Sequence, residues 1–331
     1  MLKQWREDRC VPRSATRRHI ATLGLCFALW GCADVEVDAP PARSEPLAQQ
    51  TAAPVDFGKP GPYAFVEESN VGAGFPTAGF DDTVLCEIAV PSLTNGKATP
   101  EQVATFIKYP AALNPRLHTI IRPQTLEAGK KYPVVVWGNG TCAAPNYYRT
   151  LLNHLASHGF VVITPNSRQV TSDDLLKSLS VLTQLNGNLF SPYFQKLDLT
   201  RVGTSGHAQG GIAGVIAAED PRVRTSLPVA SATLGEPGKP ILFLVGEKDA
   251  IVPFDTVYES FTATEAPRAY VLAKQADHVS PIMEAFLLHA PMAAWFRAEL
   301  MGDAQAKAFF RGPSCTLCAD PNYTVETLQL H

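Results

Sequence analysis

Two glycines flank position 208 at the spacing that a catalytic nucleophile would need. Residues 202–211 read VGTSGHAQGG, so Gly206 lies two places before Ala208 and Gly210 two places after it. A nucleophile held at a sharp strand-to-helix turn needs small residues at both places, because a Cβ atom there would collide with the backbone. A predicted strand precedes the turn and a predicted helix follows it. The pattern therefore predicts a nucleophile elbow in which alanine occupies the nucleophile position.

An acid and a histidine follow the elbow in the order that completes a catalytic triad. Asp249 comes after the apolar run PILFLVG, in EKDAIVP, and His278 comes after RAYVLA, in KQADHVSP. Taken singly, Asp249 would be a turn residue and His278 a surface histidine. As an ordered pair, each on a loop after a later strand, they are predicted to be the triad acid and the triad base.

Alanine at position 208 limits the chemistry of this predicted site. It has no proton to lose and no lone pair with which to attack a carbonyl carbon, so no acyl-enzyme can form. Ser205 and Thr204 lack the flanking glycine pair, and Cys142 is expected to be in a disulfide. Hydrolysis by a water that His278 activates would be slow, since loss of a triad nucleophile costs about 10⁶-fold in turnover.

The elements that must position these residues alternate along the chain, and this order predicts an α/β fold: a mostly parallel sheet with helices on both faces. The predicted strands cover 63–69, 117–123, 132–140, 160–165, 200–206, 240–246 and 268–273, of which the first two are expected to be antiparallel. The predicted helices cover 146–159, 172–185, 208–220 and 282–300. Gly159 is a C-terminal cap signal, and Thr171 or Ser172 an N-terminal one. Pro291 is expected to bend or break the last helix.

The N-terminus is predicted to be an export signal. Residues 1–32 combine a cationic lead with a short apolar run that is too brief to span a bilayer. LWGC resembles a lipobox, which makes Cys32 the expected lipidation site, while TRRHIA resembles a twin-arginine signal; a Sec signal with incidental arginines is the alternative. Residues 33–56 are rich in Ala and Pro and are predicted to be a tether. Residues 57–331 are predicted to form a single domain.

Export would place the remaining cysteines in an oxidising compartment, which favours disulfides. The cysteines beyond the signal are Cys86, Cys142, Cys315 and Cys318. CTLC allows a tight Cys315–Cys318 bridge, which leaves Cys86 for Cys142, although four cysteines allow three connectivities. With no second CxxC motif and no nearby histidine pair, a metal site is not expected. With 28 basic and 31 acidic residues and no long run of either sign, a nucleic-acid partner is not expected either.

Residues 60–331 resemble the bacterial α/β-hydrolases grouped with cutinases and polyester hydrolases. The stretches that carry the resemblance are VVVWGNGT, LASHGFVVITPNS, GHAQGG, GEKDAIVP, DHVSP and AAWFRAELMGD. The usual elbow of that family reads GHSQGG, so Ala208 matches the nucleophile position, Asp249 the acid and His278 the base. The resemblance implies an α/β-hydrolase fold and a carboxylic ester hydrolase that uses no cofactor and no metal.

The resemblance also implies an oxyanion hole made by two backbone N–H groups. One belongs to Gln209, and the other, from the loop after an earlier strand, is matched here to Thr141. Three aromatic residues flank that loop, at least one of them expected in the core: Trp137, Tyr147 and Tyr148. His207 is expected either to contact a ligand or to brace the elbow. The other histidines considered are expected to pack or to lie at the surface: His118, His154, His158 and His289.

Two interpretations of Ala208 remain open. An engineered Ser-to-Ala variant would explain the otherwise intact triad and oxyanion loop, whereas a natural noncatalytic homologue would explain the retained export signal. In the second case the chain is an exported lipoprotein that binds ester or polymer ligands. The short connection PVASATLGEPGKPILF predicts no large lid and an open cleft, which suits bulky or polymeric esters. A membrane contact is expected only through a lipid at Cys32.

Overall fold

The structure is a computed structural model that describes residues 54–72, 83–93, 99–233, 235–283 and 285–330. All of these belong to one compact unit that begins at Ala53. The predicted export signal, Cys32 and most of the predicted tether lie outside the described residues. No helix in the described part of the chain has the length and apolar character that a membrane span requires.

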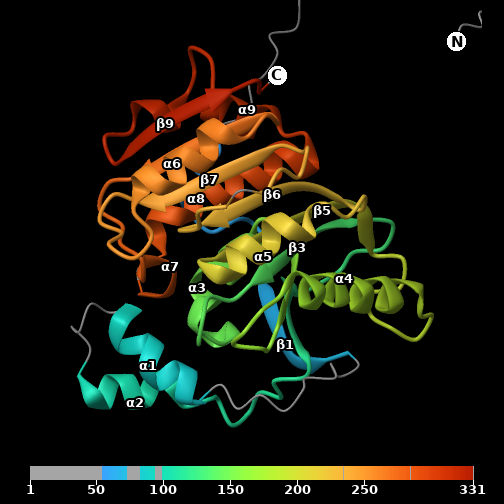
Figure 1. The fold of residues 1–331 in the computed structure, drawn as a ribbon. Helices are drawn as coiled ribbons and strands as arrows, with labels where there is room; N and C mark the ends of the chain where they lie inside the picture. Colours follow the sequence, from blue (N-terminus) through green and yellow to red (C-terminus); the bar gives the residue numbers. More distant parts are fainter. Residues whose placement is uncertain (1–53, 73–82, 94–98, 234, 284, 331) are drawn as a thin grey trace, which may run out of the picture. The chain divides into compact units, whose positions relative to one another are not determined.

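The described strands form a single sheet of nine strands in the order β1-β2-β4-β3-β5-β6-β7-β8-β9 (Figure 1). In this spatial order the six strands β4, β3, β5, β6, β7 and β8 are parallel to their neighbours in that set. Strands β1 and β2 at one edge, and β9 at the other, pair antiparallel. The strand bounds are β1 Phe65–Val71, β2 His118–Pro123, β3 Tyr132–Gly138, β4 Val161–Pro165, β5 Leu197–His207, β6 Val223–Val229, β7 Ile241–Gly246, β8 Arg268–Ala273 and β9 Tyr323–Leu328. The parallel strands therefore present their carboxyl ends at one edge, where ligand sites of such sheets form.

Alternate residues of each buried strand pack on opposite faces of the sheet. On one face, Val135 and Trp137 pack in the same cluster as α3 (Arg149–Ser157) and α8 (Phe286–Phe296). On the other, Val134 and Val136 pack in a cluster with residues of α4 and α5. The helices of this second face are α4 Ser172–Gly187, α5 Gln209–Ala217 and α6 Phe254–Ala263, drawn in front of the sheet in Figure 1. The predicted α/β-hydrolase architecture is confirmed.

The remaining helices lie along the chain before β2, beside α3 and on either side of α8. Their bounds are α1 Thr83–Leu93, α2 Pro100–Ile107, η1 Pro145–Tyr148, α7 Ser280–Met283, η2 Arg297–Met301, α9 Ala304–Phe310 and α10 Thr316–Ala319. The connection between β6 and β7 is short, in line with the expected absence of a large lid at that place. The sequence prediction did not include α1 and α2, which precede β2 in the chain.

Of the bend or break expected at Pro291, the break was wrong. Helix α8 runs through Pro291, and the interruption falls between α7 and α8 instead. A proline in a helix leaves the carbonyl four residues earlier without its N–H donor. Here that carbonyl belongs to Leu287, and the hydroxyl of Tyr323 on β9 donates to it at 2.8 Å. The tertiary hydrogen bond replaces the missing helical one, so the helix continues.

Candidate active site

Ala208 lies in the turn between the end of β5 and the start of α5. Its backbone has φ 49° and ψ −120°, in a region that residues with a Cβ atom rarely adopt. A Cβ atom added at Gly206 would lie 2.3 Å from the carbonyl oxygen of Gly210, and one added at Gly210 would lie 2.3 Å from that of Gly138. The strand, the helix and the loop after β3 thus meet where only glycine fits, which is the geometry of a nucleophile elbow.

Asp249 and His278 come together at the carboxyl ends of β7 and β8. Nδ1 of His278 lies 2.9 Å from Oδ2 of Asp249, and both side chains are buried. Because a carboxylate only accepts, Nδ1 carries the proton and Nε2 is left as the basic nitrogen. The other oxygen, Oδ1, accepts from the backbone N–H groups of Ile251 and Val252 at 2.9 and 2.8 Å. The carboxylate is thereby held in one orientation, as a triad acid requires.

The histidine loop lies next to the elbow. The ring of His207, the residue before Ala208, has its centroid 4.7 Å from that of His278. The carbonyl oxygen of Ala208 accepts from the hydroxyl of Ser231, at 2.8 Å, after β6. The loops that follow β6 and β8 therefore both contact the elbow.

The two N–H groups expected to form the oxyanion hole differ from their neighbours, since neither has an acceptor within the described part of the chain. On either side of Thr141, the N–H of Gly140 donates to the Tyr148 hydroxyl and the N–H of Cys142 donates to the carbonyl of Arg168. Among the described residues, the backbone N–H groups of Thr141 and Gln209 make no hydrogen bond. Such preorganised donors stabilise the charge that develops on a carbonyl oxygen during acyl transfer.

No alternative nucleophile replaces Ala208 among the residues considered. The Ser205 hydroxyl is buried and donates to the carbonyl of Leu227, and that of Thr204 donates to the carbonyl of Gly214. Cys142 is bridged to Cys86. The second bridge joins Cys315 to Cys318, so both disulfides have the pairing that the sequence allowed.

The bridge between Cys86 and Cys142 fastens α1 to the loop that carries Thr141. Helix α2 contacts η1: the rings of Phe106 and Tyr147 lie with centroids 4.5 Å apart and planes tilted by 32°, and the Tyr147 hydroxyl donates to the Phe106 carbonyl. Helix α1 therefore borders the oxyanion loop, and α2 contacts η1, which follows this loop; the sequence prediction contained neither α1 nor α2.

His207 braces the elbow, one of the two roles expected for it. It is buried, and burial, together with the charge of the neighbouring His278, lowers its pKa to about 3. Its Nδ1 lies 3.0 Å from the hydroxyl of Tyr148. Trp137 and Tyr148 are fully buried and Tyr147 partly so. His118, His154 and His158 are buried and His289 is half-buried, so these four act in packing.

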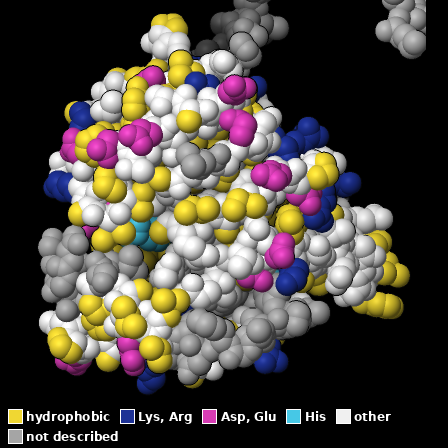
Figure 2. All heavy atoms as spheres, viewed as in Figure 1, with side chains coloured by type: hydrophobic (Ala, Val, Ile, Leu, Met, Phe, Trp, Pro, Cys, Tyr) yellow, Lys and Arg dark blue, Asp and Glu magenta, His cyan; other side chains and the backbone are white. Residues whose placement is uncertain are grey.

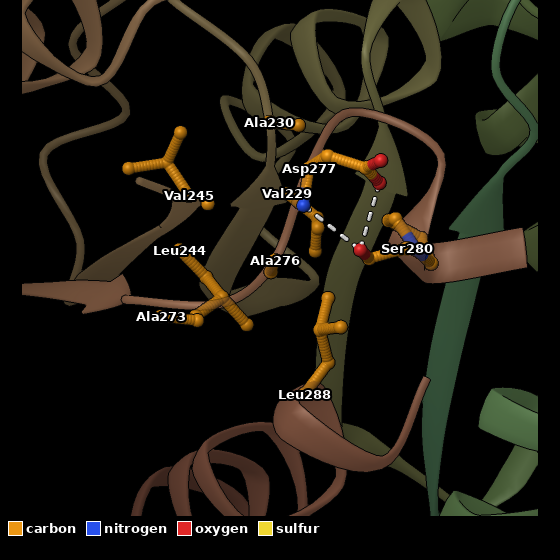
Figure 3. A pocket seen from close by; sticks show the side chains of 11 residues that line it. Val229, Ala230, Leu244, Val245, Ala273, Ala276, Asp277, Ser280 and Leu288 are labelled. Carbon is orange, nitrogen blue, oxygen red and sulfur yellow. Dashed lines mark hydrogen bonds between the residues drawn. The ribbon is translucent and has the colours of Figure 1, made fainter. Parts of the chain in front are cut away.

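A small apolar hollow lies at the carboxyl ends of β6, β7 and β8, with Val229, Leu244, Ala273 and Leu288 among its walls (Figure 3). It has room for about one water molecule. Its polar rim is closed by Ser280, whose hydroxyl accepts from the N–H of Asp277 at 2.8 Å and donates to the carboxylate of that residue at 2.9 Å. The hollow is too small for the acyl part of an ester, so we do not assign a substrate to it.

The fold agrees with what comparisons with known proteins find. The model of the family described as PET hydrolase-like matches residues 119–327, more than half of the chain. The chain belongs to the PET hydrolase-like family. The matched range includes the elbow, Asp249 and His278, and it ends within β9. Ala208 thus occupies the central position of the elbow in a member of an ester hydrolase-type family.

Two curated relatives share parts of this PET hydrolase-like chain. Lipase 1 of Moraxella sp. (strain TA144) is 27% identical over 178 residues, which are 51% of this chain and 54% of that protein. Chlorophyllase-2 of Arabidopsis thaliana is 30% identical over 86 residues, 24% of this chain and 27% of that protein. The chain therefore matches about half of the length of the first relative and about a quarter of the second.

Proposed function

We propose that this chain binds carboxylic esters at the elbow of a triad-type site and, with Ala208 in place of a nucleophile, does not form an acyl-enzyme. The observation that carries the proposal is a combination of three features. They are the elbow backbone at Ala208, the hydrogen bond between Asp249 and His278, and two backbone N–H groups to which no described residue is hydrogen-bonded. Together these groups are suited to acyl transfer, whereas the methyl side chain of Ala208 cannot act as the nucleophile.

A serine at position 208 would complete a full reaction cycle. Its hydroxyl oxygen would bond to the ester carbonyl carbon while its proton passed to Nε2 of His278, and the carbonyl oxygen would become an oxyanion held by the N–H groups of Thr141 and Gln209. His278 would then protonate the departing alkoxide. Water, deprotonated by His278, would release the carboxylic acid and restore the serine.

The surroundings of the site favour bulky or polymeric esters over small polar ones. Ile212, Phe254 and Phe286 have exposed side chains on the helices that follow Ala208, Asp249 and His278, respectively. Helix α1, bound to the oxyanion loop through its disulfide, exposes Val84, Leu85 and Ile88. Figure 2 shows apolar side chains gathered over α1 and α2, and others around a histidine at the surface. Exposed apolar patches of this kind mark binding surfaces.

The proposal extends to an exported protein anchored by a lipid at Cys32. The two disulfides support export, because such bridges persist in oxidising compartments. Either origin of Ala208, an engineered substitution or a natural loss, leads to the same site.

The decisive experiment is Ala208→Ser, assayed with short-chain nitrophenyl esters. We expect turnover to rise at least about 10³-fold, because the rest of the triad is in place. A fluorophosphonate probe should label the serine variant and not the chain as written. The matched control is Ala208→Ser combined with His278→Ala, which should lose the gain. If Ala208→Ser is folded yet neither hydrolyses esters nor reacts with the probe, the site is not a hydrolase site that lacks only its nucleophile, and the alternative of a noncatalytic binding lipoprotein is favoured.

A further inference from the structure

Three groups from separate segments form a buried hydrogen-bonded chain beside the candidate site. The N–H of Gly140, in the loop after β3, donates to the Tyr148 hydroxyl at 2.9 Å. The same hydroxyl lies 3.0 Å from Nδ1 of His207 at the end of β5. Tyr148 and His207 are both buried, and their ring centroids are 5.9 Å apart. One phenol therefore joins the oxyanion loop to the elbow.

The direction of each hydrogen bond follows from the charge states. Burial raises the pKa of Tyr148 well above its usual value, so its hydroxyl keeps its proton and donates it to Nδ1 of His207. Burial lowers the pKa of His207 to about 3, so the imidazole stays neutral and Nδ1 can accept. The hydroxyl accepts from Gly140 and donates to His207, and two bonds in such a series polarise and strengthen each other.

The backbone at Gly140 approaches the other two groups too closely for a side chain. A Cβ atom there would lie 2.8 Å from Nδ1 of His207 and 3.0 Å from the Tyr148 hydroxyl. The next residue is Thr141, whose N–H makes no hydrogen bond among the described residues. Since adjacent peptide planes share one Cα atom, fixing the N–H of Gly140 restricts the direction in which the N–H of Thr141 points.

We propose that Tyr148 is a positioning residue for the oxyanion hole. Its hydroxyl holds Gly140 against His207, and through Gly140 it sets the direction of the Thr141 N–H relative to the bend at Ala208. The proposal deepens the proposed function and rests on it. It assigns no contact between Tyr148 and the ester: the hydroxyl is buried, and its two partners are protein atoms.

The test compares Tyr148→Phe with Tyr147→Phe in the Ala208→Ser protein. Each change removes one hydroxyl; that of Tyr147 donates to the carbonyl of Phe106 on α2, which is not part of the elbow. We expect Tyr148→Phe to lower kcat by about 10- to 100-fold with KM nearly unchanged, somewhat less than the loss on deleting an oxyanion donor, because the N–H of Thr141 is displaced but still present. Tyr147→Phe should change kcat by less than about threefold. Melting temperatures of both variants show whether a loss of folding accounts for the rate.

A second measurement needs no catalysis. In the chain as written, amide hydrogen exchange followed by NMR should show the Gly140 N–H exchanging at least about tenfold faster in Tyr148→Phe than in Tyr147→Phe, since its acceptor is gone. The chemical shifts of the His207 ring should change as well, because Nδ1 loses its donor.

The outcomes separate the two proposals. If Ala208→Ser is inactive but Gly140 exchanges faster in Tyr148→Phe, the function fails while the hydrogen-bonded anchor stands. If Ala208→Ser is active and Tyr148→Phe changes kcat no more than Tyr147→Phe does, the positioning role is overturned. A loss confined to KM or to melting temperature would overturn it too, because misdirection of an oxyanion donor acts on the transition state.

Discussion

Ala208 holds a backbone conformation that its own side chain does not need. A backbone held at φ near 49° and ψ near −120° costs about 1–3 kcal/mol, and it persists only where its surroundings impose the conformation. Here the surroundings do so, because Gly206, Gly210 and Gly138 pack backbone against backbone around the turn. The scaffold, and not a catalytic hydroxyl, therefore maintains the elbow. This is why we expect serine at position 208 to be active without any other change.

The same packing makes Gly210 intolerant of a side chain. Gly210→Ala would place a Cβ atom 2.3 Å from the carbonyl oxygen of Gly138, so the loop or the helix must move. We expect the free energy of unfolding to fall by more than about 3 kcal/mol, measured by urea denaturation. Gly187→Ala is the control, since a Cβ atom there meets nothing within 4 Å. Equal stability of the two variants would show that the turn has room to adjust.

At the scale of the element, each helix or strand that bears on the site depends on contacts outside itself. Helix α8 stays continuous through Pro291 because the Tyr323 hydroxyl of β9 donates to Leu287. The first N–H groups of α4, in contrast, are hydrogen-bonded by residues of the same segment. The Thr171 side chain accepts from the N–H of Asp174, and the Asp174 side chain accepts from the N–H of Thr171. Such a capping box can be read from nearby residues. The hydrogen bond from Tyr323 to Leu287 cannot be predicted in this way, because the two residues are 36 positions apart.

Removal of the Tyr323 hydroxyl should destabilise the protein through α8. Tyr323→Phe leaves the Leu287 carbonyl without its donor, and a buried unpaired acceptor costs about 1–3 kcal/mol. Combined with Pro291→Ala, which restores a helical N–H to that carbonyl, the same change should cost less. A double-mutant cycle by chemical denaturation measures the difference. Strictly additive effects would mean that Tyr323 does not act on the carbonyl left free by Pro291.

At the scale of the whole molecule, buried histidines make folding dependent on pH. The pKa of His118, His158 and His289 is lowered to about 4 each, mainly by burial, to which the charge of the neighbouring His154 adds for His158 and His289. His154 and His289 stack with ring centroids 4.0 Å apart, and Nε2 of His154 bonds to the carbonyl of Phe57. Two charged side chains act on these histidines. The charge of Asp56 raises the pKa of His154, and that of Arg297 lowers the pKa of His158.

The sign of the pH effect follows from these shifts. In the unfolded chain a histidine takes up its proton near pH 6.5, whereas in the folded protein the three histidines with a pKa of about 4 stay neutral until lower pH. Stability is therefore fully present above about pH 6.5 and is lost progressively as pH falls towards 4. Glu299 opposes this, because burial raises its pKa.

We expect the melting temperature to fall steadily between pH 7 and pH 4.5, as followed by circular dichroism. The matched variant is His118→Gln, which removes one of the titrating groups and should give a shallower dependence on pH than the parent chain. A melting temperature that stays constant over this range would mean that the histidines are protonated in the folded state, contrary to the burial described here.

Much of the site could be predicted because it is ordered along the chain. The glycines around Ala208, then Asp249, then His278, each follow an apolar run that forms a strand, and carboxyl ends of parallel strands meet at one edge. Other parts could not be predicted. Helices α1 and α2 border the site through the Cys86–Cys142 bridge and the contact of α2 with Tyr147, and neither contact has a local pattern.

The sequence by itself determined the order of the chemical groups and the kind of element that carries each, because strand periodicity and glycine spacing are local properties of the chain. Only the tertiary structure decided that the Tyr148 hydroxyl joins Gly140 to His207, and that Tyr323 keeps α8 whole at Pro291. The physical reason is that a hydrogen bond between distant segments requires two atoms to meet within about 3 Å. That meeting depends on how every intervening strand and helix packs.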